Sequence, residues 1–211
     1  MAHRGNLFIV SGPSGAGKSV LAACLLKQVP RLRFSISYTT RPPRGSEQDG
    51  VEYYFVDRAR FEELTRTGEL LEWAEVYDNY YGTSRKFVEE VLSEGDDVLL
   101  DVDVQGAQTI RQRRPEAVGI FIMPPSFQVL RQRLETRQLD KDYVIEQRLR
   151  IAFNEIKQYK NYDFLIINEE LGKSIEELQS IVVSSRCRMS HRAQSARSIV
   201  ATFGGLDAED P

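Results

Sequence analysis

The residues with the clearest chemical potential form a glycine-rich run that ends in lysine and serine: Gly12, Pro13, Ser14, Gly15, Ala16, Gly17, Lys18 and Ser19. Glycines at these spacings let successive backbone N–H groups point into one concavity that suits phosphate oxygens. An apolar run at 7–10 precedes the loop and a helical run at 20–28 follows it, so a helix N-terminus adds positive charge there. Lys18 can then reach the outer phosphates, and the Ser19 hydroxyl is placed for Mg²⁺. The alternative is a glycine-rich turn with a solvated lysine. The full motif in this context predicts a nucleoside triphosphate site.

Two carboxylates, Asp101 and Asp103, lie at the end of the apolar run 98–102. Side chains two residues apart on a strand share one face. The carboxyl end of a parallel strand borders the crevice where α/β sheets bind ligands. Near a phosphate loop, the expected partners of these carboxylates are Mg²⁺-bound water or an arginine. An ordinary acidic pair at a strand end is the alternative.

Arg41 and Arg44 flank two prolines, which hold their spacing rigid. Two such forks can grip one anionic group. Tyr53 follows in the same segment, and then come Glu72 and the run 79–83, which contains two tyrosines and a threonine. A carboxylate, hydroxyls and two arginines can recognise a polar base at one end and its phosphate at the other. On composition alone, a solvated, charged surface lobe is equally compatible.

The elements that must position these residues follow from five short apolar runs at 7–10, 34–36, 98–102, 120–123 and 164–167. Helical periodicity separates most of them; in 144–156, for example, apolar residues recur at spacings of three and four. Continuous apolar strands that alternate with helices indicate a parallel sheet covered on both faces. The sequence therefore predicts an α/β fold in which helices flank a parallel sheet.

Two regions interrupt this alternation. Residues 35–83 predict short strands around one helix, with Asp57 as its N-cap and Gly68 as its C-terminal stop. We interpret them as a lobe inserted into a core of residues 5–34 and 84–188. Residues 131–150 predict an arginine-dense helical lid with a break near Leu139 and Asp140. Residues 189–211 form a C-terminal tail in this interpretation, and the sequence after about Arg192 is weakly patterned and predicts fraying.

Composition excludes several classes of protein. The 28 Lys and Arg against 31 Asp and Glu give a formal net charge of −3, too small to indicate a nucleic-acid or polybasic membrane surface. No apolar run approaches the roughly 20 residues of a membrane span, and the first residues do not follow the signal-peptide pattern. Cys24 and Cys187 predict reduced thiols rather than a disulfide. We therefore expect a cytoplasmic protein that binds neither nucleic acid nor membranes. The sequence gives no indication of its oligomeric state.

Four blocks, in this order, resemble the guanylate kinase family: the loop 12–19, the arginine block 37–44, the paired blocks 72–74 and 79–82, and the block 101–106. With Pro124-Pro125-Ser126 and the later arginines, the resemblance covers about residues 5–185. The ordered set is far more specific than any one block. It implies a P-loop parallel sheet with an inserted GMP-binding lobe and a helical lid. It also implies an enzyme of purine metabolism that transfers the γ-phosphoryl group of ATP to GMP, and to dGMP, with Mg²⁺.

The resemblance implies roles for single residues as well. ATP would be held by the loop residues 12–19, by Arg133 and Arg137, and by Asn168 beside the adenine, with Ser19 on Mg²⁺. GMP would be held by Ser37, Arg41, Arg44, Tyr53, Glu72, Tyr81, Thr83 and Asp101, four of which (Arg41, Arg44, Tyr53 and Tyr81) would take the phosphate. Lys18, Arg41, Arg137 and Arg148 would neutralise the charge of the transferred group.

Glu72 also has a role that its chemistry supports. Guanine offers two adjacent donors, at N1 and at its amino group, where adenine offers an acceptor and no amine. A partly buried carboxylate therefore favours guanine and is left unpaired by adenine.

Three residues depart from the family pattern: Val20, Thr83 and Gln138 stand where a second hydroxyl, a serine and a glycine are usual. Val20 affects an expected contact with the inner phosphate. Thr83 affects the packing beside the base, and Gln138 affects the flexibility of the lid hinge. Two other functions are alternatives. A phosphopeptide-binding module that has lost catalysis would be expected to degrade the loop, which is intact here. Another small P-loop kinase or NTPase with a different acceptor would have no use for the Glu72 block.

Overall fold

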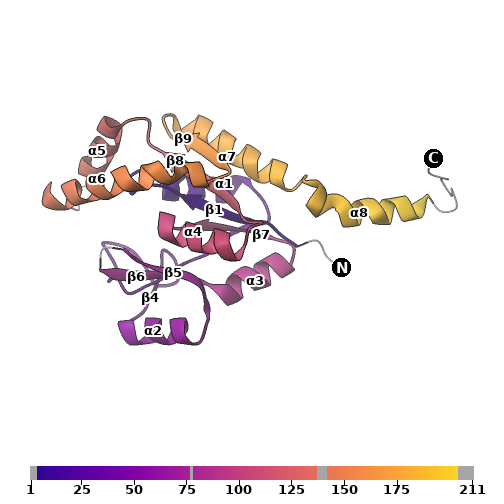
Figure 1. Ribbon diagram of the computed structural model, residues 1–211, viewed down its shortest axis with the longest axis horizontal. Helices are drawn as coiled ribbons and strands as arrows, with labels where there is room; N and C mark the ends of the chain where they lie inside the picture. Colours follow the sequence, from indigo (N-terminus) through magenta and orange to yellow (C-terminus); the bar gives the residue numbers. More distant parts are fainter. Residues whose placement is uncertain (1–3, 77, 137–141, 204–211) are drawn as a thin grey trace.

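The computed structural model describes residues 4–76, 78–136 and 142–203, and its centre is a parallel β-sheet (Figure 1). The described strands of this sheet run in the order β2, β7, β1, β8, β9, with the bounds Leu32–Phe34, Asp97–Asp101, Leu7–Ser11, Val118–Met123 and Phe164–Ile167. All neighbouring pairs are parallel. This arrangement confirms the predicted α/β fold.

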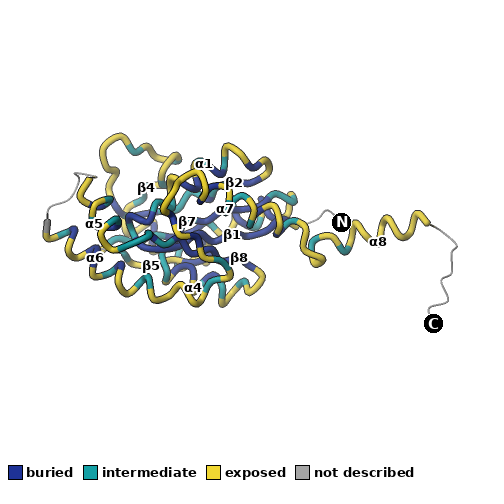
Figure 2. The backbone as a smooth tube through the Cα atoms, turned by 90° about the horizontal axis from the view of Figure 1, so that it is seen from above, coloured by how far each residue is buried: buried dark blue, intermediate teal, exposed yellow. Residues whose placement is uncertain are grey.

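Helices cover both faces of the sheet, which explains why its strands are continuously apolar. On β1, Phe8 and Val10 belong to the core beneath helices α1 (Lys18–Gln28) and α7 (Leu171–Ser185). The alternate residues Leu7 and Ile9 belong to the opposite core, under α3 and α4. These two helices span Arg85–Ser93 and Val104–Arg113. Figure 2 shows the buried strands running through the middle of the molecule.

A smaller lobe interrupts the chain between β2 and α3. Its sheet has the order β4, β3, β6, β5, with the bounds Tyr54–Phe55, Tyr38–Thr39, Asn79–Ser84 and Leu70–Val76. Helix α2 (Arg58–Arg66) buries Phe61 and Leu64 against it. The predicted helix ends are confirmed: the Asp57 carboxylate accepts a hydrogen bond from the Arg60 N–H (2.7 Å), and Gly68 adopts φ +72° just after the last turn.

A helical pair, α5 (Phe127–Thr136) and α6 (Asp142–Ile156), packs beside the main sheet. The two helices share a small apolar core made by Leu130, Leu134, Ile145, Leu149 and Ala152. A 3₁₀ turn at Lys157–Asn161 leads from α6 to β9. The break predicted near Leu139 and Asp140 lies outside the described residues.

Among the strands whose ends differ from the predicted runs, β2 and β7 differ in ways that change the interpretation. The first strand after α1 is β2, at Leu32–Phe34 rather than 34–36, because Leu32 is buried against β7 while Arg33 faces outward toward Glu94. Strand β7 ends at Asp101, so Asp103 does not share its face as expected. Asp103 instead caps helix α4, where its carboxylate accepts from the Gly106 N–H at 2.9 Å.

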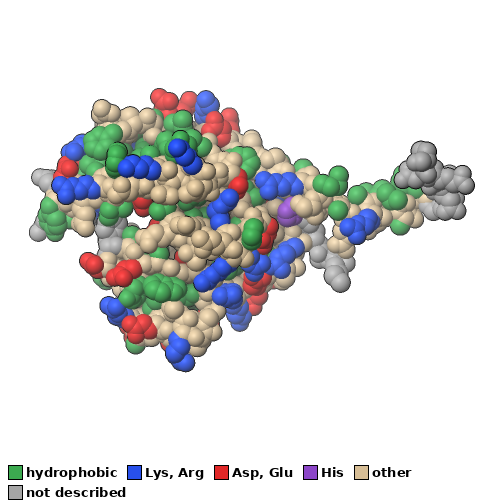
Figure 3. All heavy atoms as spheres, in the orientation of Figure 1, with side chains coloured by type: hydrophobic (Ala, Val, Ile, Leu, Met, Phe, Trp, Pro, Cys, Tyr) green, Lys and Arg blue, Asp and Glu red, His purple; other side chains and the backbone are tan. Residues whose placement is uncertain are grey.

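The prediction of a frayed tail after about Arg192 is wrong for the residues up to Thr202. Residues Met189–Thr202 form helix α8, which extends away from the body of the molecule (Figures 1 and 3). Its alanine, arginine and glutamine residues have good intrinsic helix propensity, which a search for apolar periodicity overlooks. No helix within the described ranges is long and apolar enough to cross a membrane.

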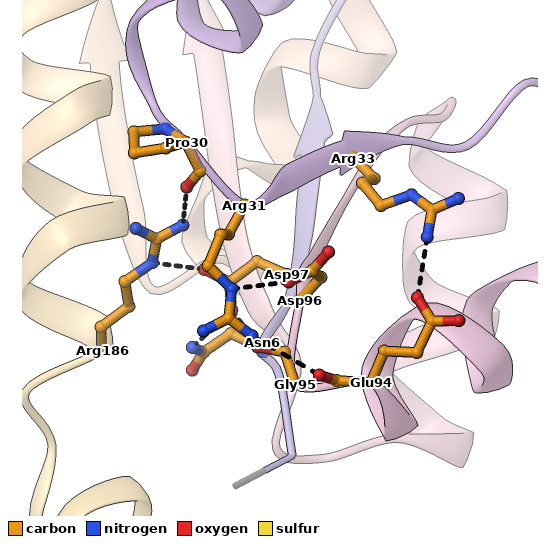
Figure 4. Close-up of polar contacts among 9 residues, drawn as sticks. All are labelled: Asn6, Pro30, Arg31, Arg33, Glu94, Gly95, Asp96, Asp97 and Arg186. Atoms are coloured by element: carbon orange, nitrogen blue, oxygen red, sulfur yellow. Dashed lines mark hydrogen bonds and ion pairs between the residues drawn. The ribbon is translucent and has the colours of Figure 1, made fainter. Parts of the chain in front are cut away.

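The base of α8 is fastened to the core through Arg186, the C-cap of α7 (Figure 4). Its guanidinium donates to the buried carboxylate of Asp97 (2.7 Å) and to the Pro30 carbonyl (2.8 Å). The backbone and side-chain amides of Asn6 donate to the other oxygen of Asp97. Arg192, in the first turns of α8, donates to the Arg186 carbonyl at 3.1 Å. This network ties the start of α8 to the core.

Candidate functional site

A cavity of about 620 Å³ lies between the carboxyl end of the main sheet, helix α6 and the small lobe. The surface is visibly hollowed between α6 and the lobe (Figure 3). It brings together most of the predicted site: Gly12, Ser14, Gly15, Gly17, Lys18, Ser19, Ser37, Arg41, Arg44, Tyr53, Glu72, Tyr81, Asp101 and Arg148. Residues from the two ends of the inserted lobe thus meet the glycine-rich loop across one space.

The glycine-rich loop joins β1 to α1 and forms one wall of the cavity. Gly15 and Gly17 have φ of +88° and +98°, which only glycine adopts without strain, and Gly17 is the N-cap of α1. The Lys18 ammonium donates to the carbonyls of Gly12 (2.7 Å) and Pro13 (3.3 Å). The lysine is therefore folded over the loop at the place where phosphate oxygens would be held.

Asn168 and Arg133 contact the outside of this loop rather than the cavity. The buried Asn168 amide donates to the Ala16 carbonyl at 2.8 Å, and the Arg133 guanidinium donates to the carbonyls of Asn168 (2.8 Å) and Ala16 (3.4 Å). These bonds hold the loop backbone in place. The expected contacts of both residues with ATP stay predictions. Arg137 and Gln138 lie outside the described residues.

Ser19 and Asp101 supply hard oxygen donors next to the loop. The Ser19 hydroxyl donates to the Asp101 carboxylate at 3.0 Å. Among the described residues there is no group of three or more His, Cys, Asp or Glu side chains able to hold a metal ion. A Mg²⁺ ion fits this corner when phosphate oxygens and water complete its shell, because Mg²⁺ prefers oxygen ligands and keeps several waters.

Glu72 lies at the far end of the cavity and is almost completely buried, at 4% exposed. It pairs across strands β5 and β6 with Thr83, whose hydroxyl donates to the Glu72 carboxylate at 2.6 Å. Burial raises the pKa of Glu72 to about 7, although the Thr83 hydrogen bond works in the opposite direction; the negative charge of Asp103 adds to the rise. A ligand that donates two hydrogen bonds to this carboxylate would offset its burial.

Gly106, in helix α4, makes room for Glu72. A Cβ atom at this position would lie 2.7 Å from the Glu72 carboxylate oxygen Oε2. Gly106→Ala should therefore displace the carboxylate, whereas the helix itself gains about 1 kcal/mol in propensity.

We expect Gly106→Ala to raise the KM for the acceptor nucleotide about tenfold, since small misplacements in a site are costly, without lowering the melting temperature. Gly172→Ala in α7 is the matched control, because a Cβ there meets no atom within 4 Å. Steady-state kinetics and thermal melting check both variants. An unchanged KM in Gly106→Ala would show that Glu72 tolerates the extra methyl group.

Arg41 marks the other end of the lobe and is buried, at 7% exposed. Its guanidinium donates to the Pro42 carbonyl (2.9 Å) and to the carboxylate of Glu47 (2.9 Å), and it lies 5.3 Å from the ring centre of Tyr53. Burial raises the pKa of the Tyr53 hydroxyl to about 12, helped by the negative charge of Asp101. Tyr53 therefore stays protonated, and its hydroxyl can donate a hydrogen bond to an anion beside Arg41.

The structure adds cavity residues that the sequence analysis did not assign, among them Glu47 and Glu155. Glu155 comes from α6, and burial raises the pKa of its carboxyl while the positive charge of Lys18 opposes the rise. Nothing in the pattern of the predicted helix 144–156 distinguishes Glu155 from its solvent-facing residues. Glu47 follows Arg44 by three residues, a spacing that predicts a turn contact.

A phosphate loop that faces, across one cavity, a pocket with a buried carboxylate at one end and arginine and tyrosine side chains at the other defines a P-loop nucleoside-monophosphate kinase. Comparison with known proteins gives the same class: residues 4–185 match the family model described as "Guanylate kinase". The chain belongs to the guanylate kinase family.

Individual relatives support this assignment over nearly the whole chain. The guanylate kinase of Hahella chejuensis is 49% identical over 187 residues, which cover 89% of this chain and 90% of the relative. That of Symbiobacterium thermophilum is 45% identical over 206 residues and covers 98% of both chains. The crystal structure of guanylate kinase from Anaplasma phagocytophilum superposes with a TM-score of 0.77 at 33% identity and covers 90% of each chain.

Proposed function

We propose that this enzyme transfers the γ-phosphoryl group of ATP to the phosphate of GMP, and also of dGMP, to give ADP and GDP or dGDP. The observation that supports this most strongly is that buried Glu72 and buried Arg41, both from the small lobe, line the same cavity as the phosphate loop. A guanine base donates two hydrogen bonds to Glu72, while its 5′-phosphate is held by Arg41, Arg44, Tyr53 and Tyr81. Ser37 and Thr83 contact the remaining base atoms.

The acceptor phosphate is already an anion, so the reaction needs no general base. The enzyme instead aligns donor and acceptor and neutralises charge on the transferred group. Lys18 and the backbone amides of the loop bind the donor phosphates, and Arg41 and Arg148 balance the charge from the acceptor and lid sides. Mg²⁺, bound to the phosphates next to Ser19 and Asp101, would supply further neutralisation.

Water must be kept from the γ-phosphate, since otherwise ATP would be hydrolysed. We assign residues 35–83 as the GMP-binding lobe, residues 5–34 and 84–188 as the core, and residues 131–150 as the lid that brings Arg148, Arg133 and Arg137 to the donor. Closure of lobe and lid over both substrates would exclude water. A location in the cytoplasm and the lack of nucleic-acid and membrane partners remain predictions.

A nucleotide panel tests the proposed function. GMP, dGMP, AMP, CMP and UMP are offered as acceptors in an ADP-release assay, with Mg²⁺ and with excess EDTA. We expect rapid turnover with GMP, turnover with dGMP, and little with the other three, all lost without the metal. A preference for AMP over GMP would overturn the base-recognition argument.

The raised pKa of Glu72 predicts how binding depends on pH. The carboxylate must be ionised to accept from guanine, and its pKa is about 7 in the free protein. Guanosine affinity should therefore rise with pH, reach half of its plateau near pH 7 and level off near pH 8, and at pH 6 it should be about tenfold below its plateau. Guanosine is the suitable ligand because it carries no phosphate that titrates in this range.

Calorimetric titration between pH 5.5 and 8.5 measures this profile. Thr83→Val provides the comparison, because loss of the Thr83 hydroxyl removes a bond to the ionised carboxylate and should move the inflection to higher pH. A flat guanosine profile in the native protein would contradict the assignment of Glu72 as the acceptor.

A further inference from the structure

Glu47 makes the central contacts of the arginine pair. One oxygen of its carboxylate accepts from the Arg41 guanidinium at 2.9 Å, and the other accepts from the backbone N–H of Arg44 at 2.8 Å. The Glu47 N–H donates in turn to the Arg44 carbonyl at 3.0 Å. A single side chain therefore bridges the two arginines and closes the turn between them.

The surroundings of Arg41 explain why it needs a carboxylate partner. Its guanidinium is buried against Tyr53 and Phe55, so its charge needs a nearby anion. Its backbone N–H is fixed by the Thr39 hydroxyl, which itself donates to the Tyr80 carbonyl. Glu47 completes this support from the cavity side, because it lines the same space as Arg41 and Arg44.

The contacts with Glu47 leave hydrogen-bond donors of Arg41 and Arg44 available. Glu47 and the Pro42 carbonyl each take one of the five N–H donors of the Arg41 guanidinium, and the bond to Arg44 uses only its backbone. The Arg44 side chain is exposed at the cavity edge. Donors on both arginines can therefore face an incoming phosphate while Glu47 keeps its place.

We propose that Glu47 is a positioning residue for the acceptor phosphate: its carboxylate presets the Arg41 guanidinium and the Arg44 turn before the nucleotide arrives. The inference rests on the proposed function, because it assigns the phosphate of GMP to this arginine pair. Preset groups lose less conformational freedom on binding, so the contribution falls on phosphate affinity. The base end of the lobe, at Glu72, does not depend on it.

The opposite role is also testable. A carboxylate bonded to Arg41 could compete with the phosphate, in which case its removal would strengthen GMP binding. Burial works to raise the pKa of Glu47, but the bonds from Arg41 and Arg44 outweigh it and hold the pKa below its usual range. The carboxylate is thus charged under all ordinary conditions, and only binding data separate support from competition.

The experiment compares GMP with guanosine, because their difference in affinity isolates the phosphate. Dissociation constants for both ligands are measured by calorimetry for the native chain, Glu47→Ala and Glu47→Gln. Glu52→Gln is the matched control, since Glu52 is an exposed acid of the same segment that also accepts a backbone N–H, from Gln48. Steady-state KM values for GMP and ATP accompany the titrations.

We expect Glu47→Ala to weaken GMP binding about 10- to 100-fold, the range for a lost hydrogen bond to a charged group, with guanosine affinity and the KM for ATP unchanged. Glu47→Gln, which keeps one acceptor oxygen without the charge, should show a smaller loss. Glu52→Gln should match the native chain.

Three results would overturn the proposal. The first is a native ratio of GMP to guanosine affinity in both Glu47 variants. The second is an equal loss of affinity for both ligands, which indicates a general defect of the lobe. The third is a gain in GMP affinity, which indicates competition. If Glu47→Ala does not fold, Glu47→Gln decides on the same ratio. Failure of the proposed function is seen separately, because the native chain itself would then not turn over GMP.

Discussion

Replacing Lys18 by alanine is expected to lower kcat for GMP phosphorylation by about 10³-fold. The ammonium lies over the loop and donates to the carbonyls of Gly12 and Pro13, where the outer phosphates of ATP would be held. Negative charge on the transferred group grows as it leaves ADP. A fixed ammonium therefore stabilises the transition state more than it stabilises bound ATP. The KM for GMP should change little, since the arginine pair and Glu72 lie on the other side of the cavity.

Lys27→Ala serves as the control for this experiment. Lys27 is an exposed lysine in the last turn of the same helix, α1, and its removal changes the net charge equally. We expect its kinetic constants to remain native. If Lys18→Ala retained more than a tenth of native kcat, the loop would bind ATP without contributing its lysine to the chemistry.

Replacing Glu72 by alanine should reduce the preference for GMP over AMP, expressed as the ratio of kcat/KM values, by about 10³- to 10⁴-fold. In the native site, AMP would leave the buried carboxylate without donors, which is costly, and GMP satisfies it. The variant loses both effects at once, so GMP becomes a poor substrate while AMP is no longer penalised. Glu72→Gln keeps the shape of the side chain but replaces one acceptor oxygen by a donor. Its kcat/KM for GMP should therefore also fall.

Glu75→Ala is the matched control, because Glu75 is an exposed acid on the same strand, β5. Competition of GMP and AMP in one reaction measures the preference directly. A native preference in Glu72→Ala would mean that another group recognises the base and that Glu72 is not the acceptor for guanine.

Local patterns were enough to predict the scaffold. The strand 164–167 is confirmed to the residue, and the caps at Asp57 and Gly68 were visible because turn and cap chemistry acts within a few positions. The glycine-rich loop was recognised on its own, since its function depends on consecutive backbone groups. The predicted range for strand β2 lay two residues too late, because the outward-facing Arg33 interrupts the apolar run.

Contacts between distant segments could not be predicted in the same way. Nothing near Asn168 in the sequence indicates that its amide would bond to Ala16, 152 residues earlier. The fit of Gly106 against Glu72 depends on how α4 packs on β5. The helix α8 was missed because a search for apolar periodicity does not register a helix in which alanine, arginine and serine predominate.

The loop's outer contacts also tie it to helix α5. Leu130 and Leu134 lie directly against Gly15, and Arg133, between them, donates to the carbonyls of Ala16 and Asn168. This stretch of α5 therefore packs directly on the loop, and its position helps to set the shape of the loop that would hold the donor's phosphates. The apolar side chains of Leu130 and Leu134 thus help to set how tightly the donor is held.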